Sequence, residues 1–576
     1  MRTLDEFVTD QRLVASLCRK RIDFARKNRR SAFVSRAAGI HREVPPDTLM
    51  GLLPPRRHWP RLLRRERATA PDLPAAKAKR LEEFVLRQLA DPEHRAWTKR
   101  LRIFLDECQA RVLGWSAKDV IAPDRFIGIP KGRPGNRMRY RVLAPYALRD
   151  AISDSVFASY LRHLIDSRLD THCYAFRLPT GGAPITHHDA VSDLRGFAAA
   201  QSTSTLWVAE CDIRGFFDSV SHDVTRRELF TLMAEVGAPS DPRLLEFLQS
   251  FLAGYDYRRA RERATEQLAK RKIVEPEIYD PDKALKESHL CVQSGKRIGI
   301  PQGSAFSSVL ANIVLTRADR ALRTALGTHR STFYARYVDD ILLASTNRRV
   351  ATRAMNAYRR ALRVLELPDH RPKAIDTTAT ETARTYWNAK SKAAYHWSLA
   401  GQSGIEWIGF LGYQLKRDGA LRVRRSSVAK ELAKQRRAID DIIRVIDRNR
   451  LRAQRHQRTY AIPKLHRIRY AAMMHLISIG IGYPSQPLIW PLPNGVCWAS
   501  GFRLLREEKG DLALLRTLDR GRGIVLNALT ARLRSLSALP GIVELKDQRV
   551  KTKFVVKRDG KPLSYYAQFS CNPRAR

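Results

Sequence analysis

The sequence predicts an α+β protein of more than one domain, with mixed strands and helices in its middle and helical segments on both sides. The chain has 576 residues, too many for one ordinary hydrophobic core. Hydrophobic residues make up 44% of it, which is typical of a globular rather than a disordered protein. Between about residues 120 and 420 the helical pattern gives way to alternating strand-like and helical segments.

Charge is the most unusual property of the composition. Lys and Arg number 104 against 58 Asp and Glu, giving a formal net charge of +46 that is spread over nearly the whole chain. A field of this sign attracts polyanions, and nucleic acid is the partner that we expect. An Arg-rich composition from a GC-rich genome would explain only part of this imbalance. No apolar run approaches the ~20 residues of a membrane span, so no membrane partner is expected.

The cysteines and the first residues indicate the compartment. Seven cysteines are scattered without a C-x-x-C pair or a cluster with histidine, so neither a disulfide framework nor a structural zinc site is expected. The start of the chain, MRTLDEFVTDQRLVASLCRKR, lacks the apolar core of a signal peptide. We therefore expect a cytoplasmic protein with reduced thiols.

The chain divides into successive segments. Residues 1–115 are expected to form a basic helical extension, interrupted by the Pro-rich VPPDTLMGLLPPRRHWP. Residues 116–420 carry the mixed pattern, with a highly charged stretch at 256–290 that we expect to be a helical insertion on the surface. Residues 421–460 are an Arg-rich helical run. Residues 461–576 combine helical segments with strand-like runs near the end, and no internal repeat is recognisable.

The stretch TFYARYVDDILLAS (332–345) places two adjacent aspartates between apolar, β-prone runs. It predicts a strand, a tight turn and a second strand, with Asp339 and Asp340 at the turn. Like charges side by side repel, so the pair is unfavourable there unless a cation compensates it. An isolated Asp pair at a hairpin is ordinarily a solvated turn, so further motifs have to decide between the two interpretations.

A third carboxylate stands at the end of another strand. In LWVAECDIRGFFDSVSHD the apolar run from Leu206 leads to Asp212, and a helix is expected from about Ser221 with Asp223 in its first turn. Magnesium takes carboxylate oxygens and leaves positions for substrate phosphates. Carboxylates on two neighbouring strands can hold two Mg²⁺ ions, with Mn²⁺ as the alternative. One ion then activates a 3′-hydroxyl and the other holds a triphosphate.

Several strings in a fixed order resemble the motifs of reverse transcriptases. DIRGFFDSVSHD, GIPQGSAFSSVLANIVL and YVDD are similar to the successive palm motifs of that family. FIGIPKGRPGNRMRYRVLAPYALRDAI and CYAFR resemble segments that precede the palm in group II intron, retron and related bacterial enzymes. LELPDHRPKAIDTT and IEWIGFLGYQL resemble the lysine-bearing and primer-grip motifs. The resemblance covers about residues 120–420. It implies a right-hand polymerase with fingers, an antiparallel palm sheet and a helical thumb.

The resemblance also assigns the chemistry to numbered residues. Asp212 and Asp339 would be the principal metal ligands, and Asp340 would complete the acidic site. The main-chain carbonyl of Ile213 would add one more ligand to the metal. Lys373 would protonate or neutralise the departing pyrophosphate, although such a lysine taken alone would be an ordinary surface residue.

The same resemblance outlines the nucleotide pocket and the support of the primer. Phe217 stands five residues after Asp212, where the family carries an aromatic ring that clashes with a ribose 2′-hydroxyl, so deoxynucleotides should be preferred. The amides of Gly215 and Phe216 would meet the triphosphate, whereas both phenylalanines would otherwise be ordinary core residues. The remaining nucleotide contacts would be Lys131, Arg139, Arg141, Gln302 and Gly303. The primer grip would consist of Trp407, Gly409, Leu411 and Gly412.

The segments on either side of residues 120–420 distinguish the subfamilies of reverse transcriptases that the chain resembles. The sequence contains no Cys/His nuclease cluster like that of mobile-intron enzymes, and no Val-Thr-Gly element like that of the shorter retron enzymes. No RNase H-like string of acids stands out in the last segment. What remains resembles the defence-associated reverse transcriptases of bacteria, including the abortive-infection types. This resemblance implies a bacterial, cytoplasmic RNA-directed DNA polymerase that copies a non-coding RNA from dNTPs in phage defence.

Several alternatives stay open at this point. An intron-type maturase would use the same palm, and a catalytically idle RNA-binding scaffold would keep it without using it. The basic N-terminal helices would hold a structured RNA by its phosphates, or they would simply be solvated. The primer would be an RNA or DNA 3′-hydroxyl, or a protein tyrosine such as Tyr565 or Tyr566. A homo-oligomer or a partner protein is also open.

Overall fold

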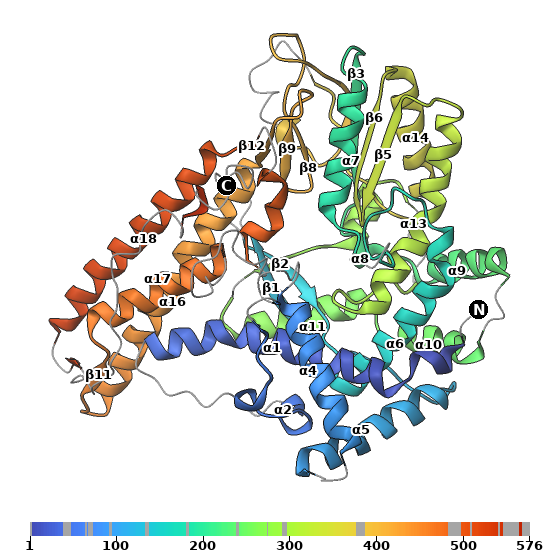
Figure 1. The fold of residues 1–576 in the computed structure, drawn as a ribbon. Helices are drawn as coiled ribbons and strands as arrows, with labels where there is room; N and C mark the ends of the chain where they lie inside the picture. Colours follow the sequence, from blue (N-terminus) through green and yellow to red (C-terminus); the bar gives the residue numbers. More distant parts are fainter. Residues whose placement is uncertain are drawn as a thin grey trace. The chain divides into compact units, whose positions relative to one another are not determined.

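Figure 1 shows the computed structural model of the chain as a ribbon. The structure describes residues 3–37, 48–63, 66, 73–91, 95–132, 138–179, 184–237, 241–273, 275–290, 296–375, 386–481, 497–506, 510–539, 542–544 and 564–566. The chain forms two compact units. The first comprises residues 1–13, 103–411 and 416–419, and the second comprises residues 14–102, 412–415 and 420–576. Helices and sheets are mixed as the predicted α+β class requires. No helix of the described part is long and apolar enough to cross a membrane.

A four-stranded antiparallel sheet forms the centre of the first unit. Its strands follow the order β5 (Thr332–Tyr337), β6 (Asp340–Ser345), β3 (Leu206–Asp212) and β7 (Lys392–Trp397). β3 and β6 lie inside the sheet, and their middle residues are buried apolar side chains. The strand from Leu206 and the strand–turn–strand at 332–345 therefore form as the sequence predicts.

Helices cover this sheet and complete its core. α14 (Arg348–Val364) packs against β3, β6 and β7, and α7 (His187–Ala200) packs against β5. α13 (Ala305–Leu326) packs along α14, α6 (Leu148–Ile165) and α9 (His222–Val236). The other elements of this unit are η1 (Leu4–Phe7), α5 (Ala96–Leu113, which belongs to it from residue 103), η3 (Asp166–Arg168), α8 (Phe216–Ser219), α10 (Pro242–Ala253) and β8 (Ile408–Phe410).

A second sheet of the first unit includes the segment expected to be a surface insertion. β1 (Ile127–Gly132) pairs antiparallel with β2 (Arg139–Leu143), and β4 (Glu277–Ile278) joins β2 as a parallel third strand. α11 (Tyr257–Lys270) packs against β1 and β2, and α12 (Pro281–Glu287) follows β4. Residues 256–290 are thus helical as expected but integrated into the fold.

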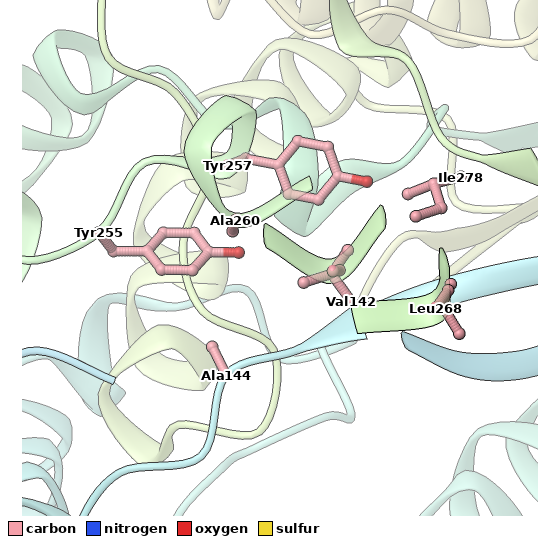
Figure 2. Packing of buried hydrophobic residues seen from close by; sticks show 8 residues of the cluster. Val142, Ala144, Tyr255, Tyr257, Ala260, Leu268 and Ile278 are labelled. Carbon is pink, nitrogen blue, oxygen red and sulfur yellow. The ribbon is translucent and has the colours of Figure 1, made fainter. Parts of the chain in front are cut away.

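The physical reason for this difference is the buried face of α11. Tyr257, Ala260, Ala264 and Leu268 recur at helical spacing and are buried, while the charged residues occupy the other face. These side chains form one apolar cluster with Val142, Ala144, Tyr255 and Ile278. Figure 2 labels Tyr257, Ala260 and Leu268 among them. The charge of the segment covers only one side of a helix whose other side belongs to the core.

The N-terminal segment also differs from the expected extension over residues 1–115. Leu4 and Phe7 are buried in the first unit, and the Phe7 ring lies 5.5 Å from that of Tyr160 on α6. Gln109 on α5 donates a hydrogen bond to the carbonyl of Val8 at 3.1 Å. Residues 3–13 and 103–113 are therefore part of the unit that carries the central sheet.

Helices also make up most of the second unit. α16 (Arg425–Arg455) packs along α18 (Ala513–Ser537), and α17 (Leu465–Gly480) packs against both. Two small sheets accompany them, one of β9 (Tyr413–Leu415), β10 (Leu421–Val423) and β12 (Gly510–Asp511), and one of β11 (Tyr460–Ile462) and β13 (Ile542–Glu544). The remaining elements are α1 (Asp10–Ala37, from residue 14), α2 (Thr48–Leu52), η2 (Arg56–His58), α4 (Leu73–Ala90) and η4 (Ala499–Arg506).

Tyr565 is buried in the second unit and ties residues 564–566 to these helices. Its hydroxyl donates to Glu431 at 2.8 Å and accepts from Gln435 at 3.2 Å. Its amide donates to Asp519 at 2.8 Å. A Cβ at position 480 would lie 2.2 Å from the hydroxyl, so only glycine fits there. The hydroxyl of Tyr565 is therefore buried among helices, whereas a tyrosine that primes synthesis would have to be accessible. Most of the neighbouring strand-like run lies outside the described residues.

We expect Tyr565→Phe to lower the free energy of unfolding of the second unit by about 1–3 kcal/mol, because the buried Glu431 carboxylate loses a donor. Tyr566→Phe is the matched control, since that ring is only half-buried and packs under Arg516. Urea unfolding of the two variants and the wild type provides the measurement. Equal midpoints for all three proteins would contradict the assigned role of the hydroxyl.

Candidate active site

Strand pairing brings the three predicted carboxylates to one end of the central sheet. Asp212 ends β3 and lies directly opposite Asp340, the first residue of β6. Opposite residues of an antiparallel pair project to the same face, with Cβ atoms about 4.5–5.5 Å apart. Asp339 stands beside them in the two-residue turn between β5 and β6. The side chains come together because both strands end at this edge.

The turn that carries Asp339 is conformationally strained. Val338 has a φ of +61°, a conformation that β-branched residues rarely adopt. Arg336 supports it from behind: its side chain is fully buried and donates to the Val338 carbonyl at 3.3 Å. The same guanidinium forms a buried ion pair with Asp319 at 2.7 Å and donates to Asn312 at 3.0 Å. This polar network anchors the turn to α13.

The electrostatics of the site favour a cation. Burial, together with the charges of Asp340 and Asp212, raises the pKa of Asp339 to about 7. Lys390 supplies one positive charge, with its Nζ 2.7 Å from Oδ2 of Asp212. Burial lowers the pKa of Lys390, but the three carboxylates outweigh this effect and raise it above the usual value. The acidic cluster is thus only partly compensated by the chain itself.

The donor set fits magnesium in its chemistry. Carboxylate oxygens are the ligands that Mg²⁺ prefers, and Ile213 lies buried beside Asp212, where its carbonyl can add a further oxygen. Among the described residues, no three His, Cys, Asp or Glu side chains are grouped closely enough to be a metal centre as they stand.

Two loops beside the carboxylates carry the predicted nucleotide contacts. They are joined by backbone hydrogen bonds, from Gly299 to the Val220 carbonyl at 2.7 Å and from Ile300 to the Phe217 carbonyl at 2.8 Å. Phe216 is buried in the core, whereas Phe217 is half-buried at the edge. Gly303 has a φ of +102° and an added Cβ would meet nothing within 4 Å, so the backbone conformation explains the glycine.

The basic candidates on β1 and β2 differ in their surroundings. Burial and the charge of Arg141 lower the pKa of Lys131, while Asp218 and Asp339 act in the opposite direction. Lys131 therefore lies within electrostatic range of Asp339 and Asp218, and Arg141 within range of Asp218. Arg139 instead pairs with Glu277 of β4 at 2.6 Å. The structure favours Arg141 over Arg139 as the arginine near the nucleotide site.

Asp218 is a site residue that the sequence analysis missed. It lies on the single turn of α8, is 6% exposed, and accepts a hydrogen bond from Nε2 of Gln302 at 2.6 Å. This bond fixes the orientation of the Gln302 carboxamide. Burial raises the pKa of Asp218 to about 7, although Gln302, Arg141 and Lys131 act to lower it. The sequence feature that could have indicated Asp218 is its place as a second acidic residue in GFFD, six positions after Asp212.

Lys390 was missed as well, and Lys373 is placed differently from the expectation. The amide of Lys373 donates to the carbonyl of Ser391, whose hydroxyl accepts from the amide of Asp212. Lys373 is thus one strand away from Asp212. Its side chain is exposed and forms no ion pair within the described residues. The lysine in contact with the carboxylates is Lys390.

The predicted primer-grip residues lie where the chain passes from the first unit to the second. Trp407 stacks under the ammonium of Lys416 at 5.3 Å in the first unit, and Gly409 lies in β8. Leu411 and Gly412 form a turn with φ values of +47° and +90°. In the second unit, a Cβ at position 412 would lie 3.3 Å from the Phe502 ring.

The family match agrees with this geometry. Residues 136–410 match the family described as reverse transcriptase (RNA-dependent DNA polymerase). This central segment is a reverse transcriptase domain, the catalytic domain of RNA-directed DNA polymerases. Its limits enclose all three carboxylates, both loops that carry predicted nucleotide contacts and the residues of β4.

A curated relative and several solved structures show more distant similarity. The COX1/OXI3 intron 1 protein of Saccharomyces cerevisiae is 25% identical over 201 residues, 35% of this chain and 18% of that protein. The chain therefore spans less than a fifth of this relative. Apo telomerase from Candida tropicalis is 9% identical with a TM-score of 0.35, over 92% of this chain and 82% of that one. A C-terminally truncated form of it gives 10% identity and a TM-score of 0.31, over 61% and 67%.

We expect the stability of Asp218→Asn relative to the wild type to increase as pH rises. The folded wild type holds the Asp218 proton up to about pH 7, whereas the unfolded chain releases it near pH 4, so the wild type loses stability between these values. The variant lacks this loss, and the difference should change by up to about 4 kcal/mol. Urea unfolding at several pH values measures it. A difference that stays constant from pH 5 to pH 8 would contradict the raised pKa.

Proposed function

We propose that the chain is an RNA-directed DNA polymerase that copies a non-coding RNA into DNA in defence against phage. The observation that carries the polymerase proposal is the pairing of Asp212 with Asp340 across β3 and β6, with Asp339 in the adjoining turn. The defence role rests on the resemblance of the motifs and the flanking segments to bacterial defence enzymes. We infer a bacterial, cytoplasmic setting on the same basis.

The described residues support particular roles in nucleotide addition. Bound magnesium would activate the 3′-hydroxyl and compensate the charge of the triphosphate. Lys131 and Arg141 would attract the triphosphate by charge, and the amides of Gly215 and Phe216 would meet its oxygens. The half-buried Phe217 ring would exclude a 2′-hydroxyl, and Gln302, oriented by Asp218, would line the pocket. Lys390 or Lys373 would neutralise the departing pyrophosphate.

The RNA and DNA partners fit the distribution of basic residues. The chain has a net charge of +46. Within the second unit, α16 buries Val428, Ala438, Ile442 and other residues on one face. Its exposed basic residues include Arg425, Lys430, Arg436, Arg437, Arg444, Arg448, Arg452 and Arg455. Such a row of cations suits a helix that follows the phosphates of a duplex, as a thumb does.

An intron-type maturase is the second candidate. The observation that favours it is the similarity to a yeast protein whose name assigns it to an intron. A maturase would help its intron RNA to splice by binding it, so splicing help would survive the loss of Asp339. A catalytically idle scaffold is less well supported, because the acidic cluster and the half-buried Phe217 are both present.

We expect Asp339→Ala to abolish deoxynucleotide incorporation, by about 10³-fold or more, because the acidic cluster loses a principal ligand. The assay uses purified protein with its copurified nucleic acid, Mg²⁺ and dNTPs. Asp223→Ala is the control, since this carboxylate is 62% exposed and its ion pair among the described residues is with Arg226 of the same helix. No incorporation by the wild type with varied templates and with Mg²⁺ or Mn²⁺ would contradict the polymerase proposal.

The defence role predicts that Asp212→Asn abolishes phage protection in bacteria that express the protein. The product DNA, rather than the protein alone, would then be required. Plaque counts on cells with wild type, Asp212→Asn and the Asp223→Ala control measure the effect, and sequencing of copurified nucleic acid identifies template and product. Full protection by Asp212→Asn would favour the idle scaffold, and no protection by the wild type would exclude the defence role.

A further inference from the structure

The segment 256–290 reaches both loops of the nucleotide pocket. One loop, residues 214–219, follows Asp212 and carries Phe217; the other, residues 297–303, carries Gln302. A tyrosine of the segment lies against a glycine in each loop, Tyr279 against Gly215 and Tyr257 against Gly299. None of the catalytic or nucleotide contacts assigned above comes from this segment.

Tyr279 holds the first loop at both ends. Its hydroxyl donates to the carbonyl of Arg214 at 2.9 Å and shares a hydrogen bond of 2.8 Å with the hydroxyl of Ser219. These two residues lie on either side of Phe217 in the sequence. Gly215 has a φ of +52°, and a Cβ there would lie 2.4 Å from the Tyr279 ring. The loop therefore lies directly on the tyrosine ring, in a conformation that favours glycine.

Tyr257 contacts the second loop and supports Tyr279. A Cβ on Gly299 would lie 2.5 Å from Cβ of Tyr257, and the Tyr257 amide donates to the Ile298 carbonyl at 2.8 Å. The Tyr257 hydroxyl donates to the carbonyl of Tyr279 at 3.2 Å. The two tyrosines are thus connected by a hydrogen bond, and together they contact both loops. The loops are joined to each other by the hydrogen bond from the Ile300 amide to the Phe217 carbonyl.

The segment is itself held rigidly. Tyr257 and Leu268 belong to the apolar cluster of Figure 2, which joins α11 to β2 and β4. A Cβ on Gly128 of β1 would lie 2.7 Å from the Leu268 side chain, so helix and strand approach closely there. Glu287 of α12 adds an ion pair with Arg214 at 2.6 Å. A rigid support of this kind fixes the geometry of the loops that rest on it.

We propose that Tyr279 is a specificity-determining positioning residue, which fixes the loop of residues 214–219 and thereby holds Phe217 where it discriminates deoxyribonucleotides from ribonucleotides. This inference rests on the proposed polymerase function and on the gate role of Phe217. A steric gate works only if its ring cannot retreat. The two hydroxyl contacts of Tyr279, one on each side of Phe217, prevent that retreat without touching the substrate.

The test is Tyr279→Phe, which keeps the ring under Gly215 and removes only the hydroxyl. The ratio of kcat/KM for a deoxynucleotide to that for the matching ribonucleotide should fall about tenfold. The change should come from improved use of the ribonucleotide, with kcat for the deoxynucleotide within about twofold of the wild type. A purely structural role would instead lower both activities together.

Tyr255→Phe is the matched control. Tyr255 belongs to the same cluster, and its buried hydroxyl has no hydrogen-bond partner among the described residues. This variant should keep the wild-type discrimination. An unchanged ratio in Tyr279→Phe would overturn the inference, and so would an equal fall in both variants, because that would indicate general loosening of the cluster.

A binding measurement separates this inference from the proposed function. Fluorescence anisotropy with dATP and ATP labelled on the base, in the presence of Mg²⁺, reports sugar preference without turnover. If the wild type incorporates nothing, the polymerase proposal fails, and the inference then stands only if the wild type prefers dATP and Tyr279→Phe loses that preference. A wild type that binds both nucleotides equally would overturn the inference. The same readout decides the case if Tyr279→Phe binds but does not turn over.

Discussion

The antiparallel register between β3 and β6 is the constraint on which the rest of the site depends. It places Asp212 opposite Asp340, and a slip of one residue would turn one of these side chains to the other face. The apolar residues of both strands are packed against their neighbours in this register, so a slip would disturb that packing. The strained turn at Val338 brings Asp339 beside the pair, and the buried Arg336 donates to the turn.

This arrangement concentrates negative charge at one point of a strongly basic chain. Lys390 contacts Asp212, and the charge of Lys131 interacts with Asp339. Burial and the charges of Asp340 and Asp212 nevertheless raise the pKa of Asp339. A site of this kind attracts divalent cations locally. The net charge of +46 attracts polyanions such as nucleic acid to the chain as a whole.

The sequence predicted the parts of the site whose signals are local. β3 and the 332–345 hairpin are apolar runs that end in aspartates, so their limits and their acids could both be inferred. Asp218 could not, because its importance comes from Gln302, 84 residues away. Lys390 could not be inferred either, because its contact with Asp212 joins residues 178 positions apart in the sequence. The sequence analysis placed residues 256–290 on the surface, because the buried face of α11 includes the small residues Ala260 and Ala264, which give no strong apolar pattern.

Residues 256–290 also explain why glycine occupies positions 215 and 299, which the resemblance of the motifs alone does not. Gly215 and Gly299 both have positive φ, and both face a tyrosine of residues 256–290 at a distance that excludes any side chain. The loops of the pocket and the tyrosines beneath them therefore constrain each other, although they lie far apart in the sequence. Because Tyr279 contacts the residues Arg214 and Ser219 on both sides of Phe217, a change in this support would move the Phe217 ring without altering any residue predicted to contact the nucleotide. In the proposed polymerase, selectivity would therefore depend on packing behind the loops as well as on the residues in front of them.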